Sequence, residues 1–165
     1  MTEITYASFS EEETLHLGCV LGAFLVPEIA VLLSGDLGAG KTVLVRGIGE
    51  ALEVKRVRSP SFTLINEYPT KFFPLVHVDL YRLASRDVEE LGLEEYAEDG
   101  AVLLVEWAER WNSPRLGDVL KIEITSRGEN ERIFKISSFG EKTGSLLARL
   151  NRALKMTEKN GAHER

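Results

Sequence analysis

The chain has 165 residues and a formal net charge of −6, from 20 Lys and Arg residues against 26 Asp and Glu residues. This length is typical of one domain, and the acidic balance disfavours a module that holds RNA or DNA by itself, because such modules usually carry a clear basic excess. A single cysteine, Cys19, excludes an internal disulfide, no apolar run is long enough for a membrane span, and the first residues lack a signal-peptide pattern, so we expect a cytoplasmic globular protein.

Apolar runs of strand length alternate with amphipathic stretches of helix length, which is typical of an α/β domain. Ser10 and Glu13 have the spacing of a capping box for a first helix that ends before Pro27. We expect residues 1–154 to form a single domain, followed by a polar, flexible tail at 155–165. The further predicted elements are strands at 4–7, 29–33, 62–68, 75–79 and 101–105, a hairpin from 119–124 and 132–137, and helices at 41–52, from Ser85 onward and through Leu146, Leu147, Leu150 and Leu154.

A complete phosphate-binding motif lies between the strand at 29–33 and the next helix. Residues 35–42 read Gly-Asp-Leu-Gly-Ala-Gly-Lys-Thr and match G-x-x-x-x-G-K-[ST], with a strand before and a helix after, as the motif requires. Here the backbone N–H groups of Gly38, Ala39 and Gly40 can face phosphates at a helix amino terminus, which favours anions. Lys41 would reach the β- and γ-phosphates, and the Thr42 hydroxyl would bind Mg²⁺. We therefore predict that the chain binds a nucleoside triphosphate.

This motif completes the expected fold class. We predict a P-loop NTPase-like, three-layer α/β domain with a mostly parallel central sheet and a C-terminal antiparallel hairpin. The run at 101–105 is continuously apolar, which is typical of a central parallel strand buried on both faces.

Two predicted strands end in a carboxylate, as a metal-binding strand of a P-loop site should. One ends at Asp79 and the other at Glu106, and the second follows the more apolar run. We assign Glu106 to Mg²⁺ and Asp79 to the attacking water or to the shell behind the metal, with the reverse assignment left open. His77 lies on the same face of its strand as Asp79 and serves either a proton relay or a structural hydrogen bond. Cys19 is interpreted as a core residue.

The segment Ser59-Pro60-Ser61-Phe62-Thr63 places three hydroxyl groups around a proline, just after the P-loop helix. Such a connection can sense a γ-phosphate and act as a nucleotide switch. It can equally be an ordinary turn before a strand. Trp107 and Trp111, beside Glu106, are equally compatible with core packing and with a partner surface.

Taken together, four segments resemble those of the TsaE family (older name YjeE), small P-loop ATPases of tRNA threonylcarbamoyladenosine synthesis. The P-loop is shared by many families, whereas His-x-Asp-Leu-Tyr-Arg-Leu together with Val-Glu-Trp is far more selective. Order, spacing and length also fit, although Ala108 stands where proline often follows the tryptophan. The matching segments are 35–42, 59–64, 77–83 and 105–107.

The resemblance implies a bacterial cytoplasmic ATPase that supports t⁶A formation next to the tRNA anticodon without transferring the threonylcarbamoyl group itself. Its implied partner is the TsaD–TsaB heterodimer, with tRNA met only through that complex, and its implied cofactors are ATP and Mg²⁺. Carried over by position, Lys41 contacts phosphate, Thr42 and Glu106 hold Mg²⁺, and Asp79 takes part in catalysis. The Ser59–Thr63 loop lies near the γ-phosphate, and Thr63 is the residue of this loop assigned to nucleotide binding. Glu11 and Arg132 match the surroundings of the base and ribose.

Other uses of the same motif remain as alternatives. A small-molecule or nucleotide kinase would need a lid that excludes water, and only Arg82 and Arg86 lie close to Asp79 as candidate lid arginines. A GTPase of the common kind would carry an Asn-Lys-x-Asp segment, which this sequence lacks. A structural subunit with a relic nucleotide site is the fourth possibility.

Overall fold

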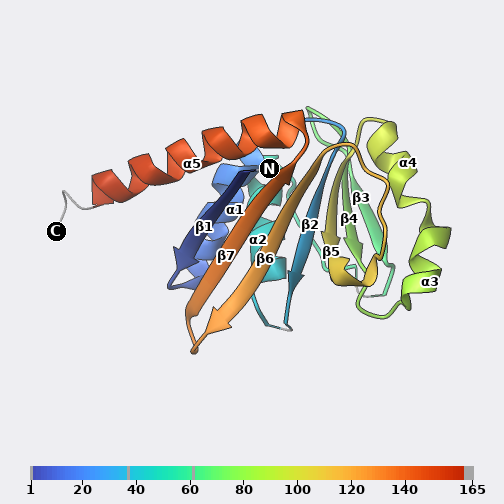
Figure 1. The fold of residues 1–165 in the computed structure, drawn as a ribbon, viewed down its shortest axis with the longest axis horizontal. Helices are drawn as coiled ribbons and strands as arrows, with labels where there is room; N and C mark the ends of the chain where they lie inside the picture. The colour runs from blue at the N-terminus through green and yellow to red at the C-terminus, as the bar shows by residue number, and fades with distance from the viewer. Residues whose placement is uncertain (1, 37, 61, 162–165) are drawn as a thin grey trace.

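The computed structural model describes residues 2–36, 38–60 and 62–161. These residues form one seven-stranded sheet in the order β1-β7-β6-β2-β5-β4-β3, with helices packed on it (Figure 1). The strands are β1 (Thr2–Ser8), β2 (Ile29–Gly35), β3 (Ile65–Tyr68), β4 (Leu75–Asp79), β5 (Val102–Glu106), β6 (Val119–Arg127) and β7 (Glu131–Phe139). The helices are α1 (Glu11–Phe24), α2 (Lys41–Ala51), α3 (Ser85–Val88), α4 (Leu93–Glu98) and α5 (Glu141–Gly161), with 3₁₀ turns η1 (Glu89–Leu91) and η2 (Ala108–Arg110).

The centre of the sheet is parallel and its margins are antiparallel. Strand β2 pairs in parallel with both β5 and β6, and β5 pairs in parallel with β4. The hairpin β6–β7 and strand β1 continue the sheet on one side, and β3 closes the other side antiparallel to β4. The predicted α/β class, with its mostly parallel sheet and C-terminal hairpin, is confirmed.

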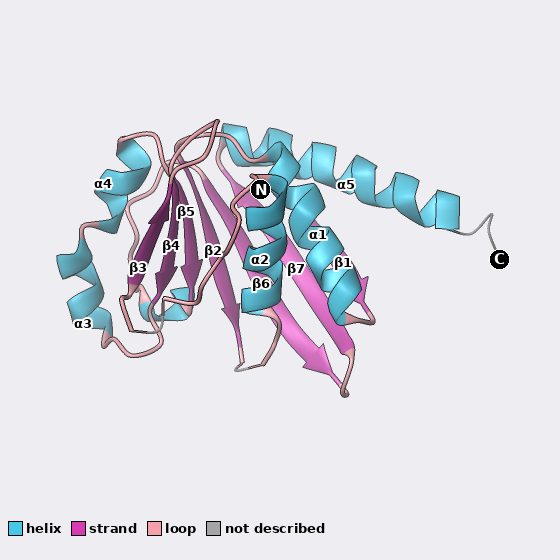
Figure 2. Ribbon diagram, turned by 180° about the vertical axis from the view of Figure 1, so that it is seen from behind, coloured by secondary structure: helices cyan, strands magenta, loops and turns pink. Residues whose placement is uncertain are grey.

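Both faces of the sheet are covered, which explains why β2 and β5 are apolar over most of their length. Alternate residues of β2 point to opposite faces: Val31 and Leu33 pack with α1, α2 and α5, whereas Leu32 packs with α3, α4 and η2. Figure 2 shows α1 and α2 lying across one face of the sheet. The result is the predicted three-layer arrangement.

The start of α1 follows the predicted capping box, with one difference. The Ser10 hydroxyl accepts a hydrogen bond from the Glu13 backbone N–H (3.1 Å), which confirms Ser10 as the N-cap. The Glu13 carboxylate accepts from the N–H of Phe9 (2.8 Å), one residue before the cap. Both bonds satisfy backbone donors at the helix entrance.

Most element boundaries agree with the sequence prediction to within one to three residues, and three regions differ more. The strand predicted at 62–68 begins only at Ile65, because Leu64 has a left-handed backbone (φ 67°) and its N–H is bound in a turn to the Pro60 carbonyl (2.8 Å). The acidic helix predicted from Ser85 is divided into α3, η1 and α4, and Gly92 at φ 62° separates the last two. Helix α5 continues beyond Leu154 to Gly161, through part of the predicted tail.

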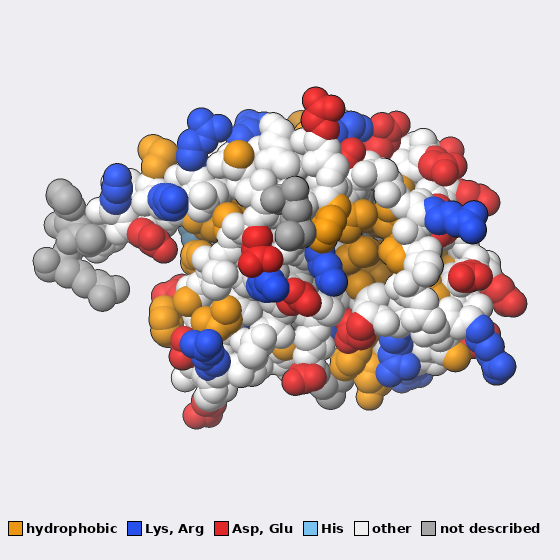
Figure 3. All heavy atoms as spheres, in the orientation of Figure 1, with side chains coloured by type: hydrophobic (Ala, Val, Ile, Leu, Met, Phe, Trp, Pro, Cys, Tyr) orange, Lys and Arg blue, Asp and Glu red, His pale blue; other side chains and the backbone are white. Residues whose placement is uncertain are grey.

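The surface agrees with the charge balance of the chain. On the face shown in Figure 3, Lys and Arg side chains are interspersed with Asp and Glu. No helix within the described residues is both long enough and apolar enough to cross a membrane.

Candidate functional site: a P-loop cavity at the carboxyl edge of the sheet

The carboxyl ends of β2, β5 and β4 meet at one edge of the sheet, where ligands bind in open α/β folds. In the strand register, Glu106 lies opposite Leu33 on one side and opposite Asp79 on the other. Glu106 shares its face of the sheet with Leu104, which packs with α1 and α2. By the same alternation, His77 and Asp79 lie on the face of Leu75. The two predicted acids are therefore brought together beside the start of α2.

The loop from Gly35 to Thr42 joins β2 to α2 as the P-loop motif predicts. Gly40 is the N-cap of α2 and has a left-handed backbone (φ 104°), which glycine adopts without strain. Position 35 also requires a glycine, since a Cβ there would lie 2.6 Å from the Ile124 carbonyl oxygen. Leu37 lies outside the described residues. The glycines of the motif therefore allow a wrap that side chains would block.

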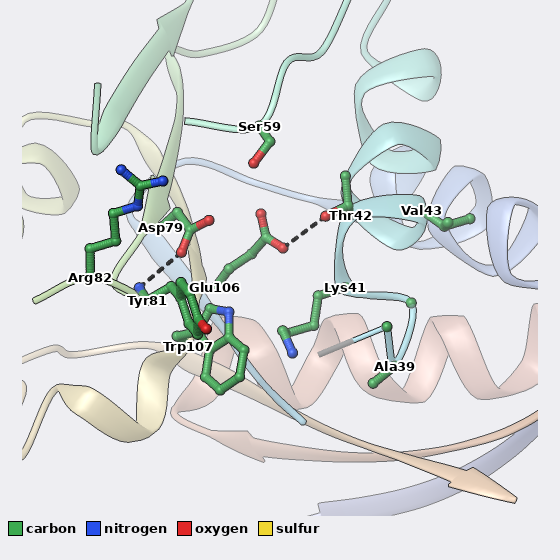
Figure 4. A pocket seen from close by; sticks show the side chains of 12 residues that line it. Ala39, Lys41, Thr42, Val43, Ser59, Asp79, Tyr81, Arg82, Glu106 and Trp107 are labelled. Carbon is green, nitrogen blue, oxygen red and sulfur yellow. Dashed lines mark hydrogen bonds between the residues drawn. The ribbon is translucent and has the colours of Figure 1, made fainter. Parts of the chain in front are cut away.

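A cavity of about 410 Å³ opens in front of this loop (Figure 4). Most predicted site residues contribute to its wall. The lining residues are Gly38, Ala39, Gly40, Lys41, Thr42, Val43, Ser59, Asp79, Tyr81, Arg82, Glu106 and Trp107.

Lys41 is buried and held inside the P-loop. Its ammonium group donates to the carbonyl oxygens of Gly35 and Asp36, the second at 2.9 Å, and lies 4.2 Å from the centre of the Trp107 ring. Burial lowers the pKa of Lys41, and the negative charge of nearby acids, Glu109 first, partly offsets this. The Lys41 ammonium is therefore desolvated and bound to neutral acceptors, which an anion could replace.

Glu106 is held at both carboxylate oxygens. Its Oε1 accepts from the Thr42 hydroxyl (3.2 Å), and its Oε2 is 2.5 Å from Nε2 of His77 (Figure 4 shows the first contact). Glu106 is 3% exposed and His77 is fully buried. Within the described residues Nδ1 of His77 has no partner, so the tautomer with its proton on Nε2 leaves no buried donor unmatched. His77 thus makes a structural hydrogen bond, one of the two roles expected from the sequence.

The oxygen atoms of Thr42 and Glu106 suit Mg²⁺, which prefers hard oxygen ligands and keeps several waters or phosphate oxygens. Among the residues that the structure describes, no group of three or more His, Cys, Asp or Glu residues could by itself cage a metal ion. A Mg²⁺ ion at Thr42 and Glu106 would therefore take its other ligands from a bound nucleotide and from water.

Asp79 faces the cavity from the end of β4. Its Oδ1 accepts from the backbone N–H of Tyr81 (2.9 Å), and its other oxygen points into the cavity (Figure 4). The Asp79 backbone N–H in turn donates to the carbonyl oxygen of Leu64 (3.0 Å), which ties this carboxylate to the loop after α2. One oxygen is therefore fixed by the chain and the other is turned toward the space a substrate would fill.

The loop after α2 contributes one hydroxyl to the cavity wall. Ser59 lines the cavity, whereas the Thr63 hydroxyl donates to the side chain of Asn66 (2.9 Å). Ser61 lies outside the described residues. The structure therefore brings the start of the predicted switch to the P-loop and leaves Thr63 engaged with β3.

Glu11 and Arg132 come together on the other side of the P-loop. Both line a neighbouring cavity of about 210 Å³ that also includes Gly38 and Gly40. Arg132 donates to the Gly38 carbonyl (3.4 Å), and Glu11 forms an ion pair with Arg46 of α2 (2.9 Å). The β6–β7 hairpin and the start of α1 thus meet beside the phosphate loop.

Sequence reasoning left several residues of this region unresolved or misplaced. Trp107 lines the cavity with a left-handed backbone (φ 57°), whereas Trp111 is buried in the core. Tyr81 packs on Trp107, with ring centres 4.9 Å apart, and was not singled out by sequence reasoning, although it lies within the family segment 77–83. The interpretation of Cys19 as a core residue is wrong, because Cys19 is partly exposed on α1 and its thiol contacts Glu50.

Comparisons with known proteins agree on one family. The sequence model of the family described as "Threonylcarbamoyl adenosine biosynthesis protein TsaE" matches residues 8–134. The tRNA threonylcarbamoyladenosine biosynthesis protein TsaE of Bacillus subtilis (strain 168) is 37% identical over 153 residues, which cover 92% of this chain and 96% of the relative. The protein of the same name from Nostoc sp. (strain PCC 7120) is 40% identical over 153 residues, with 90% and 93% covered.

The fold is similar to a solved structure over nearly the same span. The crystal structure of Bacillus subtilis YdiB superposes with a TM-score of 0.80 and 34% sequence identity, covering 92% of this chain and 96% of YdiB. The similarity therefore extends over nearly the whole domain.

Proposed function

Because the chain belongs to the TsaE family of threonylcarbamoyl adenosine biosynthesis proteins, we propose that it is an ATP-binding and ATP-hydrolysing subunit required for t⁶A formation in tRNA. It acts on a TsaD–TsaB complex in the cytoplasm and does not transfer the threonylcarbamoyl group itself. Family membership supports the pathway, and the arrangement of the cavity supports the chemistry.

One observation carries the ATPase proposal: the Thr42 hydroxyl, at the start of the P-loop helix, lies 3.2 Å from the Glu106 carboxylate at the end of the neighbouring strand. A P-loop enzyme needs a hydroxyl and an acid at these two places. In the proposed site Thr42 and Glu106 hold Mg²⁺. When bound, the ion neutralises charge on the β- and γ-phosphate oxygens.

The remaining groups have roles that follow from their positions. Backbone N–H groups of Gly38, Ala39 and Gly40 cradle the phosphates, and Lys41 exchanges its two carbonyl acceptors for phosphate oxygens. Asp79 orients the attacking water through the oxygen that faces the cavity.

Two further groups of residues complete the proposed site. Glu11 and Arg132 border the place for the base and ribose, on the side of the P-loop where their cavity lies. Thr63 approaches the γ-phosphate only if the loop after α2 rearranges, since its hydroxyl is now bound to Asn66.

Hydrolysis assays on single variants test the proposed chemistry. Lys41→Ala and Glu106→Ala should reduce phosphate release from Mg–ATP to the background rate, while Lys155→Ala, an exposed residue of α5, should retain the wild-type rate. All variants should remain folded by circular dichroism. Hydrolysis by Glu106→Ala at the wild-type rate would show that the metal assignment is wrong. Transfer of labelled γ-phosphate to an acceptor other than water would point to a kinase instead.

The partner proposal needs its own experiment. The protein is mixed with candidate TsaD and TsaB subunits in the presence of ATP, of ADP or of neither, and complex formation is followed by size-exclusion chromatography. We expect association that depends on the nucleotide and turnover of ATP that changes on association. No association under any of the three conditions would contradict the proposed partner.

A further inference from the structure

Arg82 is a second cation at the wall of the P-loop cavity. It follows β4, three positions after Asp79, and lines the cavity together with Lys41 and Thr42. Among the described residues that line this cavity, Lys41 and Arg82 carry positive charge, and Asp79 and Glu106 carry negative charge. The hydrolysis proposed above assigns roles to Lys41, Thr42, Asp79 and Glu106, and none to Arg82.

Charge considerations favour a role for this arginine. During phosphoryl transfer negative charge is spread over the γ-phosphate and the bridging oxygen, and an arginine at this place raises kcat by roughly 10³–10⁵-fold in P-loop enzymes that use one. Without Arg82, Lys41 would be the one cationic side chain of the described cavity wall to face this charge, with the acids Asp79 and Glu106 nearby. A guanidinium group suits the task because it stays protonated and offers several donors in one plane.

The guanidinium group of Arg82 lies away from the proposed phosphate position in front of Lys41 and Thr42. Its guanidinium lies 4.8 Å from the ring centre of Phe62, and Figure 4 shows it turned away from Lys41 and Thr42. Within the described part of the chain this side chain has no recorded hydrogen bond or ion pair. Phe62 is 87% exposed, so the stack lies in solvent, where such contacts are weak. Hydrogen bonds from arginine to phosphate are much stronger.

We infer that Arg82 is a catalytic residue that contacts the γ-phosphate during hydrolysis, and that its stack on Phe62 holds the guanidinium away from the phosphate position until a triphosphate binds. This inference rests on the proposed ATPase function. In the step itself, a water oxygen bonds to the γ-phosphorus as the bond from that phosphorus to the β–γ bridging oxygen breaks. ADP, inorganic phosphate and one proton are released, and Arg82 remains protonated throughout.

The stack also connects two loops at the mouth of the site. Phe62 belongs to the loop after α2, which contributes Ser59 to the cavity and binds the Asp79 backbone through Leu64. A movement of Arg82 toward phosphate would release Phe62. The loop between α2 and β3 would then change its surface according to whether the nucleotide carries a γ-phosphate.

The test compares Arg82→Ala, Arg82→Lys and Phe62→Ala with the matched control Arg86→Ala, whose side chain is 89% exposed and does not line the cavity. For each, kcat and KM are measured with Mg–ATP, and calorimetry gives the affinities for ADP and for ADP with aluminium fluoride, which mimics the transition state. Arg82 is itself exposed, so its removal should leave the fold intact.

We expect Arg82→Ala to lower kcat at least 100-fold and to weaken ADP–aluminium fluoride by a similar factor, with ADP affinity within twofold of wild type. Arg82→Lys should recover part of the loss, and Arg86→Ala should match wild type. Phe62→Ala should raise turnover of the isolated protein about two- to fivefold, as loss of a weak stack implies.

If Arg82→Ala retains kcat within threefold, Arg82 is not catalytic. If Phe62→Ala lowers turnover, the stack does not hold Arg82 back. A wild-type protein that hydrolyses no ATP, alone or with TsaD and TsaB, overturns the proposed function and this inference with it.

Discussion

At the level of single residues, Glu106 depends on a partner that the sequence presented as ambiguous. Its carboxylate is almost completely buried, and burial of a charge is costly unless hydrogen bonds replace the lost water. The Nε2–H of His77 and the hydroxyl of Thr42 supply these bonds from β4 and α2. His77 therefore fixes the direction in which Glu106 presents its free electron pairs to the cavity.

Replacement of His77 tests this dependence. In His77→Leu the Glu106 carboxylate loses a buried donor, so the free energy of unfolding in urea should fall by about 1–3 kcal/mol. Hydrolysis should also require more Mg²⁺ for half-maximal rate, because the proposed metal ligand is less well positioned. His77→Gln, whose amide can still donate, is the matched control and should recover part of both effects. Unchanged unfolding and unchanged Mg²⁺ dependence in His77→Leu would show that the contact has no such role.

Cys19 offers a second test at this level, because it is the only thiol in the chain. Burial raises the pKa of the Cys19 thiol, and the hydrogen bond to Glu50 (3.6 Å) and the charge of Glu50 raise it further. Since the thiolate is the reactive form, alkylation by iodoacetamide near pH 8 should be slow. Glu50→Gln should lower this pKa and speed alkylation several-fold. The two proteins should react equally when unfolded in urea, and equal rates in the folded state would contradict the assigned cause.

The places of site residues were therefore predictable where a motif dictates them. They were much less predictable where contacts between distant segments decide them. The P-loop spacing alone was sufficient to place Lys41 and Thr42 at the cavity wall. The positions of Arg82 and Trp107 depend on how the loops after β4 and β5 turn, which no local pattern in the sequence specifies. Cys19 was misjudged because helical periodicity does not reveal that Glu50 of α2 lies beside it.

At the level of elements, α1 and α2 cross at unusually close range because glycines face each other. A Cβ on Gly47 would lie 2.3 Å from the Leu15 carbonyl oxygen and 3.0 Å from Cα of Gly18. A Cβ on Gly18 would likewise lie 2.3 Å from the Leu44 carbonyl oxygen. The obstructing atoms are backbone, so the helices themselves would have to separate. This contact positions α2, and with it the P-loop, against the rest of the domain.

Gly47→Ala should therefore be strongly destabilising although alanine favours helices. Overpacking of this kind usually costs about 1–3 kcal/mol, which exceeds the gain of about 0.5–1 kcal/mol from replacing a helical glycine. Gly144→Ala in α5 is the control: its Cβ would meet nothing closer than Ser138 Oγ at 4.0 Å, so it should be neutral or slightly stabilising. Urea unfolding measures both. A Gly47→Ala protein as stable as Gly144→Ala would mean that the helices are not held at this distance.

The central strands were among the elements that the sequence predicted best. Strand β4 has the predicted bounds, and β2 and β5 differ from theirs by one or two residues, because a buried parallel strand reads as an uninterrupted apolar run. The region after β4 was predicted least well. Its acidic composition suits an exposed helix, but the pattern does not reveal that Gly92 interrupts it.

For the whole molecule, the two ends of the chain are joined in a way that local patterns do not reveal. Strand β1 pairs with β7, with Thr2 opposite Ser138, and thereby extends the sheet begun by the C-terminal hairpin. The α/β class and the parallel centre followed from the alternation of elements, whereas the strand order depends on pairings between residues far apart in sequence. Helix α5 then lies against β7, β1 and α1 and closes this half of the domain.

The last turns of α5 are predicted to be dispensable, consistent with our expectation that the domain ends near residue 154. Leu146, Leu147, Leu150 and Leu154 are its buried leucines, and every side chain from Lys155 to Gly161 is exposed. Removing residues 155–165 should therefore change the free energy of unfolding in urea by no more than about 1 kcal/mol, since tolerance to truncation follows burial.

Leu150→Ala serves as the contrasting variant, because loss of a buried leucine costs about 2–5 kcal/mol. The truncated protein should also hydrolyse Mg–ATP at the wild-type rate, since none of the described residues in the removed segment lines the P-loop cavity. A loss of stability in the truncated protein comparable to that of Leu150→Ala would place the domain boundary beyond residue 154. Slower hydrolysis with unchanged stability would instead show that the end of α5 influences the nucleotide site. That result would contradict the prediction.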